Sequence, residues 1–270
     1  MGNSERKPTG IQSVEVAGTL LKAFVDLPGP ASLTQLSGHS RITPTKARRY
    51  LVSLIRAGLV SQSQETGRYE LGPLALSIGL TALGQFDVMR HASQRLTSIR
   101  EQTGETTFLS VKSVSGASII EFRESNGPIA LTARVGATLP FLTTATGWTF
   151  VSFDPDVEAE MINEWTGTED RAPLTEVLRG HDSIAARAAS IRDLGYVHLE
   201  GVFQVGTCAI SAPVFDLRNR LIASLTVVLP RERATSERIS EIGTILGNSG
   251  KLGSASEHVT VGRDPDVSSA

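Results

Sequence analysis

The sequence contains a single cysteine, Cys208, among its 270 residues. One thiol excludes a framework of internal disulfides and any zinc or iron–sulfur site built from several cysteines. Aromatic residues make up only 5% of the chain. No apolar run approaches the roughly 18 residues that a membrane-spanning helix needs, and the polar N-terminus lacks the apolar core of a signal peptide. These absences predict a cytoplasmic protein that makes no contact with a membrane.

A large excess of either charge is also missing, because 26 Lys and Arg face 28 Asp and Glu. Such a balance ordinarily argues against nucleic-acid binding, but the charges are unevenly spread. Residues 1–72 carry nine basic and five acidic side chains, a net charge of +4, and the remainder carries 17 and 23, a net charge of −6. No acid occurs between Asp26 and Glu65. A basic segment joined to an acidic bulk is typical of a nucleic-acid-binding module fused to another domain.

Helix signals divide the first 72 residues into three helices. Ser13 is predicted to cap the first helix and Ser32 a short second one. The third helix is predicted to start at Thr43, with Pro44 in its first turn, and to end at Gly58. Short polar residues between the second and third helices allow a tight turn, so these segments predict a helix-turn-helix.

The third helix is apolar on one face and basic on the other, where it carries no carboxylate. Residues 59–62 and 68–71 are predicted strands joined by a glycine-containing loop, which places a β-hairpin, or wing, directly after this helix. A basic helix followed by a wing predicts a winged helix-turn-helix that binds the major groove of DNA. The alternative is a small helical domain with a surface hairpin that binds nothing. The predicted DNA-contacting residues are Thr43, Thr45, Lys46, Arg48, Arg49, Ser53 and Arg68.

The rest of the chain predicts a linker helix and then an α+β domain. Residues 73–86 are apolar on more than one face, which indicates packing on two sides. Hairpin strands with helices grouped between them predict an antiparallel sheet flanked by helices. The polar segments 1–10 and 253–270 are predicted to be disordered. The predicted helices are 87–101, 146–153, 156–165, 174–194 and 235–246, and the predicted strands are 106–111, 118–122, 129–135, 196–200, 207–215 and 221–229.

Several segments of the chain resemble the IclR family of bacterial transcriptional regulators. Residues 42–54 resemble its recognition helix, residues 66–72 its wing, and residues 136–147 and 208–216 its C-terminal motifs. The resemblance implies a DNA-binding domain over 11–72, a linker and dimerisation helix over 73–86 and a GAF-like effector-binding domain over 87–252.

The resemblance also implies an effector pocket between the sheet and the helical loops. Exposed N–H groups at the start of a helix favour an anion such as an organic acid. Val228 and His198 depart from the family, which often has a hydroxyl residue and an acid there. Cys208 has the alternative role of a buried apolar residue, and Thr144 that of a helix cap. The implied pocket residues are Thr143, Thr144, Ala145, Gly147, His198, Glu200, Cys208, Thr226 and Val228.

Together these features predict a ligand-responsive regulator, either a repressor or an activator. It is expected to bind a palindromic operator in double-stranded DNA as a homodimer or tetramer, and to need no cofactor. The alternative is a metabolite-binding enzyme or sensor whose N-terminal domain mediates protein contacts only. Catalysis is not expected, because residues 247–251 lack the glycine and hydroxyl of a phosphate loop and no nucleophile-elbow motif occurs. The five histidines lack the spacing of metal ligands.

Overall fold

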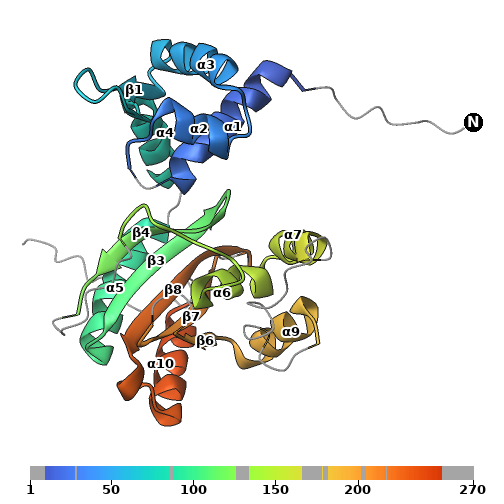
Figure 1. Cartoon of the computed structure of the whole chain (residues 1–270). Helices are drawn as coiled ribbons and strands as arrows, with labels where there is room; N and C mark the ends of the chain where they lie inside the picture. Colours follow the sequence, from blue (N-terminus) through green and yellow to red (C-terminus); the bar gives the residue numbers. More distant parts are fainter. Residues whose placement is uncertain are drawn as a thin grey trace, which may run out of the picture.

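The computed structural model describes residues 10–27, 29–84, 88–125, 134–165, 178, 182–201, 205–216 and 218–250. It contains a small helical N-terminal domain and a larger domain built on a sheet, drawn as two separate bodies in Figure 1. The tails predicted to be disordered lie outside the described residues, apart from Gly10. Within the described ranges, no helix has the length and apolar character needed to cross a membrane.

The N-terminal domain is the predicted winged helix-turn-helix. The hydroxyl of Ser32 accepts a hydrogen bond from the N–H of Gln35, whose side chain accepts one from the N–H of Ser32, so the second helix starts with a capping box. The prediction that Ser13 caps the first helix is wrong, because Ile11 occupies the cap and makes no side-chain cap bond. The elements are α1 (Gln12–Asp26), α2 (Leu33–His39), α3 (Pro44–Arg56), β1 (Val60–Gln62), β2 (Tyr69–Leu71) and α4 (Pro73–Gly84).

One apolar core holds this domain together. Leu20, Leu36 and Leu51 place fully buried side chains from α1, α2 and α3 at its centre. The antiparallel pair β1–β2 adds Val60 and Tyr69 to the same core. The wing is therefore packed against the helices, which fixes its position beside α3.

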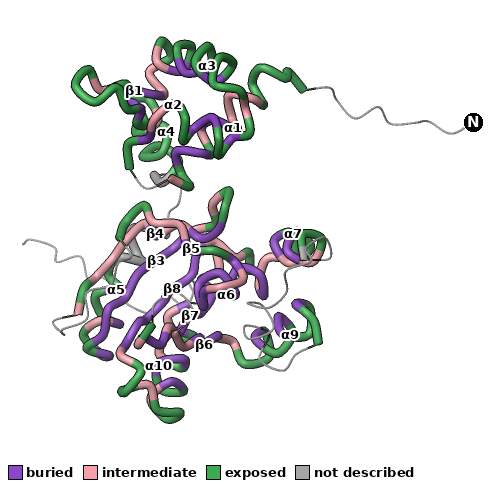
Figure 2. The backbone as a smooth tube through the Cα atoms, in the orientation of Figure 1, coloured by how far each residue is buried: buried purple, intermediate pink, exposed green. Residues whose placement is uncertain are grey.

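The α4 helix leaves most of its apolar side chains in water. Leu76, Ile78 and Leu80 are 54–65% exposed in the single chain, and Figure 2 shows α4 as largely exposed. The predicted packing on two sides is therefore not made within the described part of the chain. Residues 85–87, where the predicted linker ends, lie outside the described residues.

The C-terminal domain has a six-stranded, wholly antiparallel sheet with the order β5-β4-β3-β8-β7-β6. This architecture confirms the predicted α+β fold. Its helices are α5 (Val88–Thr103), α6 (Ala145–Phe153), α7 (Pro155–Trp165), α9 (Ile184–Leu194) and α10 (Ser236–Ser249). Its strands are β3 (Thr106–Ser113), β4 (Gly116–Arg123), β5 (Thr138–Leu139), β6 (Val197–Glu200), β7 (Thr207–Phe215) and β8 (Leu221–Pro230).

Each face of the sheet has its own core, because successive side chains of a strand point to opposite faces. On β8, Leu225 and Val227 pack with α5 and α10, whereas Thr226 and Val228 face α6. We call these the α10 face and the α6 face of the sheet. Helices α7 and α9 lie on the α6 side, as Figure 1 also shows.

Two predicted elements differ from the structure. Of the strand predicted over 129–135, residues 129–133 lie outside the described residues, and Arg134 and Val135 are not in a strand. The short β5 begins instead at Thr138. The helix predicted over 174–194 is described as α9 only from Ile184 onward, where Ser183 caps it through a bond from the N–H of Ala186.

Candidate nucleic-acid interface and effector site

Helix α3 presents a polar, basic face to solvent. Its opposite face buries Ala47, Leu51 and Leu54 in the domain core, as the 3.6-residue period requires. No cation of α3 is held in an ion pair with another described residue. The predicted contact residues on this helix and its cap are all exposed: Thr43, Thr45, Lys46, Arg48, Arg49 and Ser53. The face therefore offers hydrogen-bond donors and positive charge without a competing carboxylate.

Arg68 has a structural contact that the sequence did not predict. Its Nη1 donates to the backbone oxygen of Pro30 at 2.9 Å, which ties the wing to the turn between α1 and α2. Ala31 and Tyr69 pair beside it in an isolated β-bridge. The guanidinium has five N–H donors, and Arg68 is exposed, so this bond leaves donors available to a phosphate.

The first turn of α6 is fixed by a cap and a close backbone approach. The hydroxyl of Thr144 accepts from the N–H of Gly147 at 2.9 Å and donates to the oxygen of Pro140 at 2.8 Å. A Cβ added at Gly147 would lie 2.3 Å from the Pro140 oxygen, so only glycine fits there. Thr144 thus acts as the helix cap, the structural role that the sequence left open for it. Ala145 is buried beside it, and Thr143 is half-buried.

Four buried hydroxyl groups join α6 to the sheet, and we call them the hydroxyl seam. Thr226 Oγ1 lies 2.9 Å from Thr146 Oγ1 and donates to Ser211 Oγ at 3.0 Å. Because a hydroxyl has one hydrogen, Thr226 must accept the hydrogen bond from Thr146. Thr149 Oγ1 also contacts Ser211 Oγ, at 2.8 Å. None of these four residues is more than 1% exposed, so their hydrogen bonds are shielded from water.

The α6 face also holds hydroxyls that lack partners. Ser110 and Ser224 are opposite residues on β3 and β8, on the same face as Thr226, and both are fully buried. Neither hydroxyl has a hydrogen-bond partner within the described part of the chain. An unsatisfied buried hydroxyl costs about 1–3 kcal/mol, so this face is less stably packed than an apolar one.

The structure does not bring the predicted pocket residues together. Thr226 and Val228 face α6, whereas Cys208 lies in the apolar core of the α10 face. His198 and Glu200 pair with Ile210 and Cys208 across β6 and β7, so they share the α10 side. Cys208, His198 and Glu200 therefore lie on the opposite face of the sheet from α6.

The neighbours of Val228 on the α6 face are residues that the sequence reasoning missed. Ala209 pairs with Val228, and Leu199 pairs with Ala209. Ala209 is next to Cys208 in the sequence, and Leu199 lies between His198 and Glu200. Alternation along the strand was the signal that would have found them, once the cross-strand register was known.

Glu200, Cys208 and Trp148 each make contacts within the domain. Glu200 forms an ion pair with Arg231 at 3.3 Å, at the edge of the sheet. Cys208 is 0% exposed among aliphatic side chains, which is the structural role that the sequence left open for it. Trp148, in the same helix as Ala145 and Gly147, is fully buried and donates from Nε1 to the oxygen of Leu142 at 2.9 Å, so it holds the loop that leads into α6.

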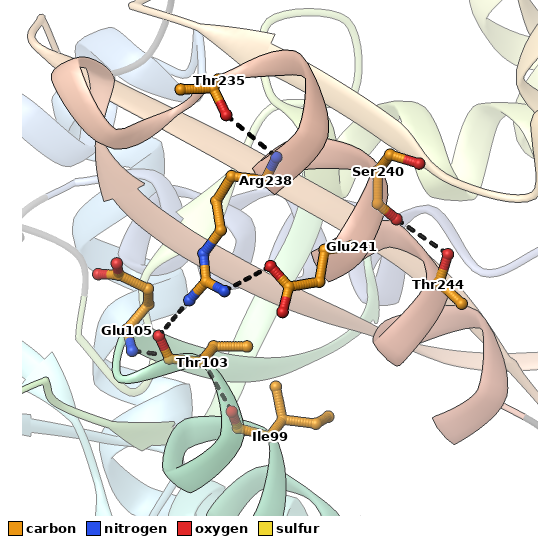
Figure 3. Close-up of polar contacts among 8 residues, drawn as sticks. All are labelled: Ile99, Thr103, Glu105, Thr235, Arg238, Ser240, Glu241 and Thr244. Atoms are coloured by element: carbon orange, nitrogen blue, oxygen red, sulfur yellow. Dashed lines mark hydrogen bonds and ion pairs between the residues drawn. The ribbon is translucent and has the colours of Figure 1, made fainter.

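A cluster of charged residues lies on the α10 side of the sheet, where α10 meets α5 (Figure 3). Arg238 donates to the backbone oxygen of Thr103 at 2.5 Å and pairs with Glu241 at 2.7 Å. Glu105 is 3% exposed and pairs with Arg233 at 2.9 Å. Burial raises the pKa of Glu105, and the attraction of Arg233 and Arg238 opposes that shift without cancelling it. These contacts fasten α10 and the residues just before it to the end of α5 and the residue pair that leads into β3.

The described residues contain no group of three or more His, Cys, Asp or Glu side chains placed to hold a metal ion.

Comparison with known proteins agrees with both domains. Residues 80–252 match the family described as bacterial transcriptional regulator IclR C-terminal, and residues 13–64 match the IclR helix-turn-helix domain. The chain is 24% identical to the HTH-type transcriptional regulator KdgR of Escherichia coli over 90% of its own length and 91% of that protein. It is 23% identical to the transcriptional repressor IclR of Escherichia coli, covering 87% and 86%. These relatives are transcriptional regulators and not enzymes.

Solved structures show the same fold. An IclR transcriptional regulator from Alicyclobacillus acidocaldarius aligns with a TM-score of 0.68 at 23% identity, over 90% of this chain and 97% of that one. An IclR homologue from Microbacterium hydrocarbonoxydans, crystallised in complex with 4-hydroxybenzoate, aligns with a TM-score of 0.64 at 17% identity, over 88% and 98%. The family matches span both domains and cover most of the sequence, so the chain belongs to the IclR family of bacterial transcriptional regulators.

Proposed function

We propose that this protein is a cytoplasmic, dimeric regulator that binds an operator through α3 and the wing and responds to a small organic acid. The observation that carries the DNA-binding part is the exposed basic face of α3, which has no acid on it and no ion pair to a described residue. Exposed cations that form no such ion pair remain available to phosphates and to the acceptor edge of guanine.

The N-terminal half of α3 is the part proposed to read bases. Thr45, Lys46 and Arg49 lie within its first two turns and are exposed. In the helix-turn-helix arrangement the N-terminal residues of the recognition helix meet the base edges. Arg48 on α3 and Arg68 in the wing are proposed to contact phosphates.

The exposed apolar side chains of α4 support a homodimer. Leu76, Ile78 and Leu80 form part of an apolar surface that the described residues of the chain do not cover. Burying it against the α4 helix of a second copy removes this surface from water, which favours association. A dimer with two-fold symmetry presents two α3 helices and therefore binds a palindromic operator.

The proposed effector site lies at the N-terminal end of α6, above the α6 face of the sheet. The first turn of a helix favours a carboxylate through its N–H groups and its dipole. Val228, Ala209 and Leu199 line the neighbouring part of the sheet and offer an apolar surface. A compact acid with an apolar body suits this combination, and the 4-hydroxybenzoate complex of a structural relative is consistent with it.

The hydroxyl seam supplies the proposed route from effector to DNA. A ligand beside Thr144 is next to Thr146, whose hydroxyl is bonded to Thr226 on the sheet. Displacing that bond would move α6 relative to β7 and β8. The ligand alters DNA binding only if it favours one arrangement of the two DNA-reading heads over the other.

Two measurements on the full-length protein test this function. A duplex is first obtained by selecting a randomised library against the purified protein. Fluorescence anisotropy then gives Kd for that duplex with and without each member of a panel of aliphatic and aromatic carboxylic acids. At least one acid should raise the melting temperature by mass action and change Kd for the duplex. Stabilisation by none of the acids would contradict the organic-acid assignment, and failure to select any duplex would contradict DNA binding.

A further inference from the structure

Arg41 lies in the turn between α2 and α3, with its backbone in the left-handed region at φ 52°. Two hydrogen bonds define the turn. The N–H of Arg41 donates to the oxygen of Gly38 at 3.2 Å, and the N–H of Ile42 donates to the oxygen of Ser37 at 3.0 Å. This is the Schellman arrangement, in which the residue after the helix end is usually glycine, because a Cβ makes the left-handed conformation unfavourable.

Other helices in the chain end in the usual way. Gly58 follows α3 at φ 76°, with the same pair of hydrogen bonds: its N–H donates to Ile55, and that of Leu59 donates to Leu54. Gly104 and Gly195 follow α5 and α9 at φ 72° and φ 82°. Glycine therefore occupies the equivalent position at these helix ends, and Arg41 departs from that rule in the turn that leads into α3.

No contact within the described part of the chain explains why an arginine occupies this left-handed position. Arg41 is exposed, and its guanidinium makes no hydrogen bond or ion pair with another described residue. The conformational cost is thus not offset by any contact within the described part of the chain. Strain of this kind is found at functional sites, where a partner supplies the compensating interaction.

We infer that Arg41 contacts a DNA phosphate beside the N-terminal end of α3. The inference rests on the DNA-binding function proposed above. Arg41 stands two residues before Thr43, the cap of α3, in the acid-free stretch that carries Lys46 and Arg49. A planar guanidinium with several donors suits a phosphate, and phosphate contacts fix the register of a protein on the duplex without reading its sequence. Arg41 therefore sets affinity and position, and the residues on α3 set sequence preference.

The test compares full-length wild type with Arg41→Gly and Arg41→Lys on the duplex selected by the wild-type protein. Arg41→Gly should raise Kd about tenfold and lower the slope of log Kd against log salt by about 0.9, as expected for one lost phosphate contact. The ranking of duplexes with single base changes should stay the same. The melting temperature should not fall, because glycine accepts the left-handed conformation. Arg41→Lys keeps the charge and should keep the slope.

Asn219→Gly is the matched control. Asn219 is the other described non-glycine residue with positive φ, at 59°, and it lies in the β7–β8 turn. The change relieves a similar backbone conformation in the other domain and should leave DNA binding unaltered. If Arg41→Gly lowers the melting temperature, Arg41→Asn replaces it in the same measurements of Kd and salt slope, since asparagine tolerates this conformation.

Three results would overturn the inference. The first is an unchanged Kd and salt slope in Arg41→Gly. The second is a loss of affinity without a change of slope, which would assign Arg41 to the shape of the turn. The third is an equal loss of slope in Arg41→Lys. A wild-type protein that selects no duplex would overturn the DNA-binding function as well, and is recognised before any variant is made.

Discussion

The two faces of the six-stranded sheet are built from different chemistry. The α10 face is packed with aliphatic side chains such as Leu225 and Val227, with α5 and α10 above them. The α6 face carries Ser211, Ser224 and Thr226 at fully buried positions. Apolar contacts lose stability steeply when they shift, whereas hydroxyls can exchange one hydrogen-bond partner for another. The strand residues of the α10 face are mainly aliphatic, whereas those of the α6 face mix buried hydroxyls with apolar side chains such as Phe108 and Val228.

The largest expected effect is on the α10 face. Leu225→Ala removes a side chain that is 1% exposed from that core. It should destabilise the protein by about 2–5 kcal/mol, the range for a buried leucine whose cavity does not collapse. Urea denaturation followed by circular dichroism measures this change. A loss below 1 kcal/mol would mean that the α10 face is not tightly packed, which would contradict the stated difference between the two faces.

Thr226→Val tests the adjacent residue on the opposite face. The change keeps the shape of the side chain and removes the hydroxyl that joins Thr146 to Ser211. The expected loss is about 1–3 kcal/mol, because two buried hydroxyls lose a partner. In the same denaturation experiment, a change equal to that of Leu225→Ala would show that the two faces contribute alike. Thr226→Ser, which keeps the hydroxyl, is the control.

Ser224→Ala should have a small effect of the opposite sign. The hydroxyl of Ser224 is buried without a partner among the described residues, so its removal should stabilise the protein by up to about 1 kcal/mol. Destabilisation by more than 1 kcal/mol would show that the hydroxyl is bonded in solution, for example to a buried water. Thermal unfolding beside wild type decides the sign.

The smallest expected effect is on the pH dependence of stability, through Glu105 beside the end of α5. Burial raises the pKa of Glu105 in the folded state. The folded protein therefore binds the proton more tightly than the unfolded chain, and this contribution to stability is fully present below the ordinary pKa and is lost as pH rises through the raised value. Glu105→Gln should flatten the fall of stability that wild type shows as pH rises above the ordinary pKa of a glutamate. Denaturation curves across this range that match those of wild type would contradict the assignment.

The sequence was sufficient for the winged helix, because α3 shows both a clear apolar stripe and a one-sided distribution of charge. It was also sufficient for the antiparallel sheet, whose hairpins follow from turn residues. The side chains of the proposed effector site were harder to predict. The register between β7 and β8 shifts near Val214 and Phe215, so Phe215 pairs with Leu221 while Val214 pairs with Ala223.

The family resemblance grouped Cys208 with Thr226 and Val228, and the structure places Cys208 on the opposite face of the sheet from these two residues. Counting straight back from the turn at 216–220 would pair Cys208 with Val228, whereas the structure pairs Cys208 with Leu229 and Ala209 with Val228. A slip of one residue moves a side chain to the other face of a sheet. The sequence around Ile222 has no glycine or other marker of a bulge, so the shift depends on packing of the whole sheet.

The most direct test of the account measures DNA binding by the full-length protein as salt is varied. Wild type should bind the duplex that it selects with an affinity that falls steeply with salt, because several phosphates are contacted. Arg49→Ala should weaken binding by about 1–3 kcal/mol and relax the preference at one position of each half-site. A wild-type affinity that does not change with salt, or an Arg49→Ala variant that binds the duplex as wild type does, would contradict the assignment of α3 as the recognition helix.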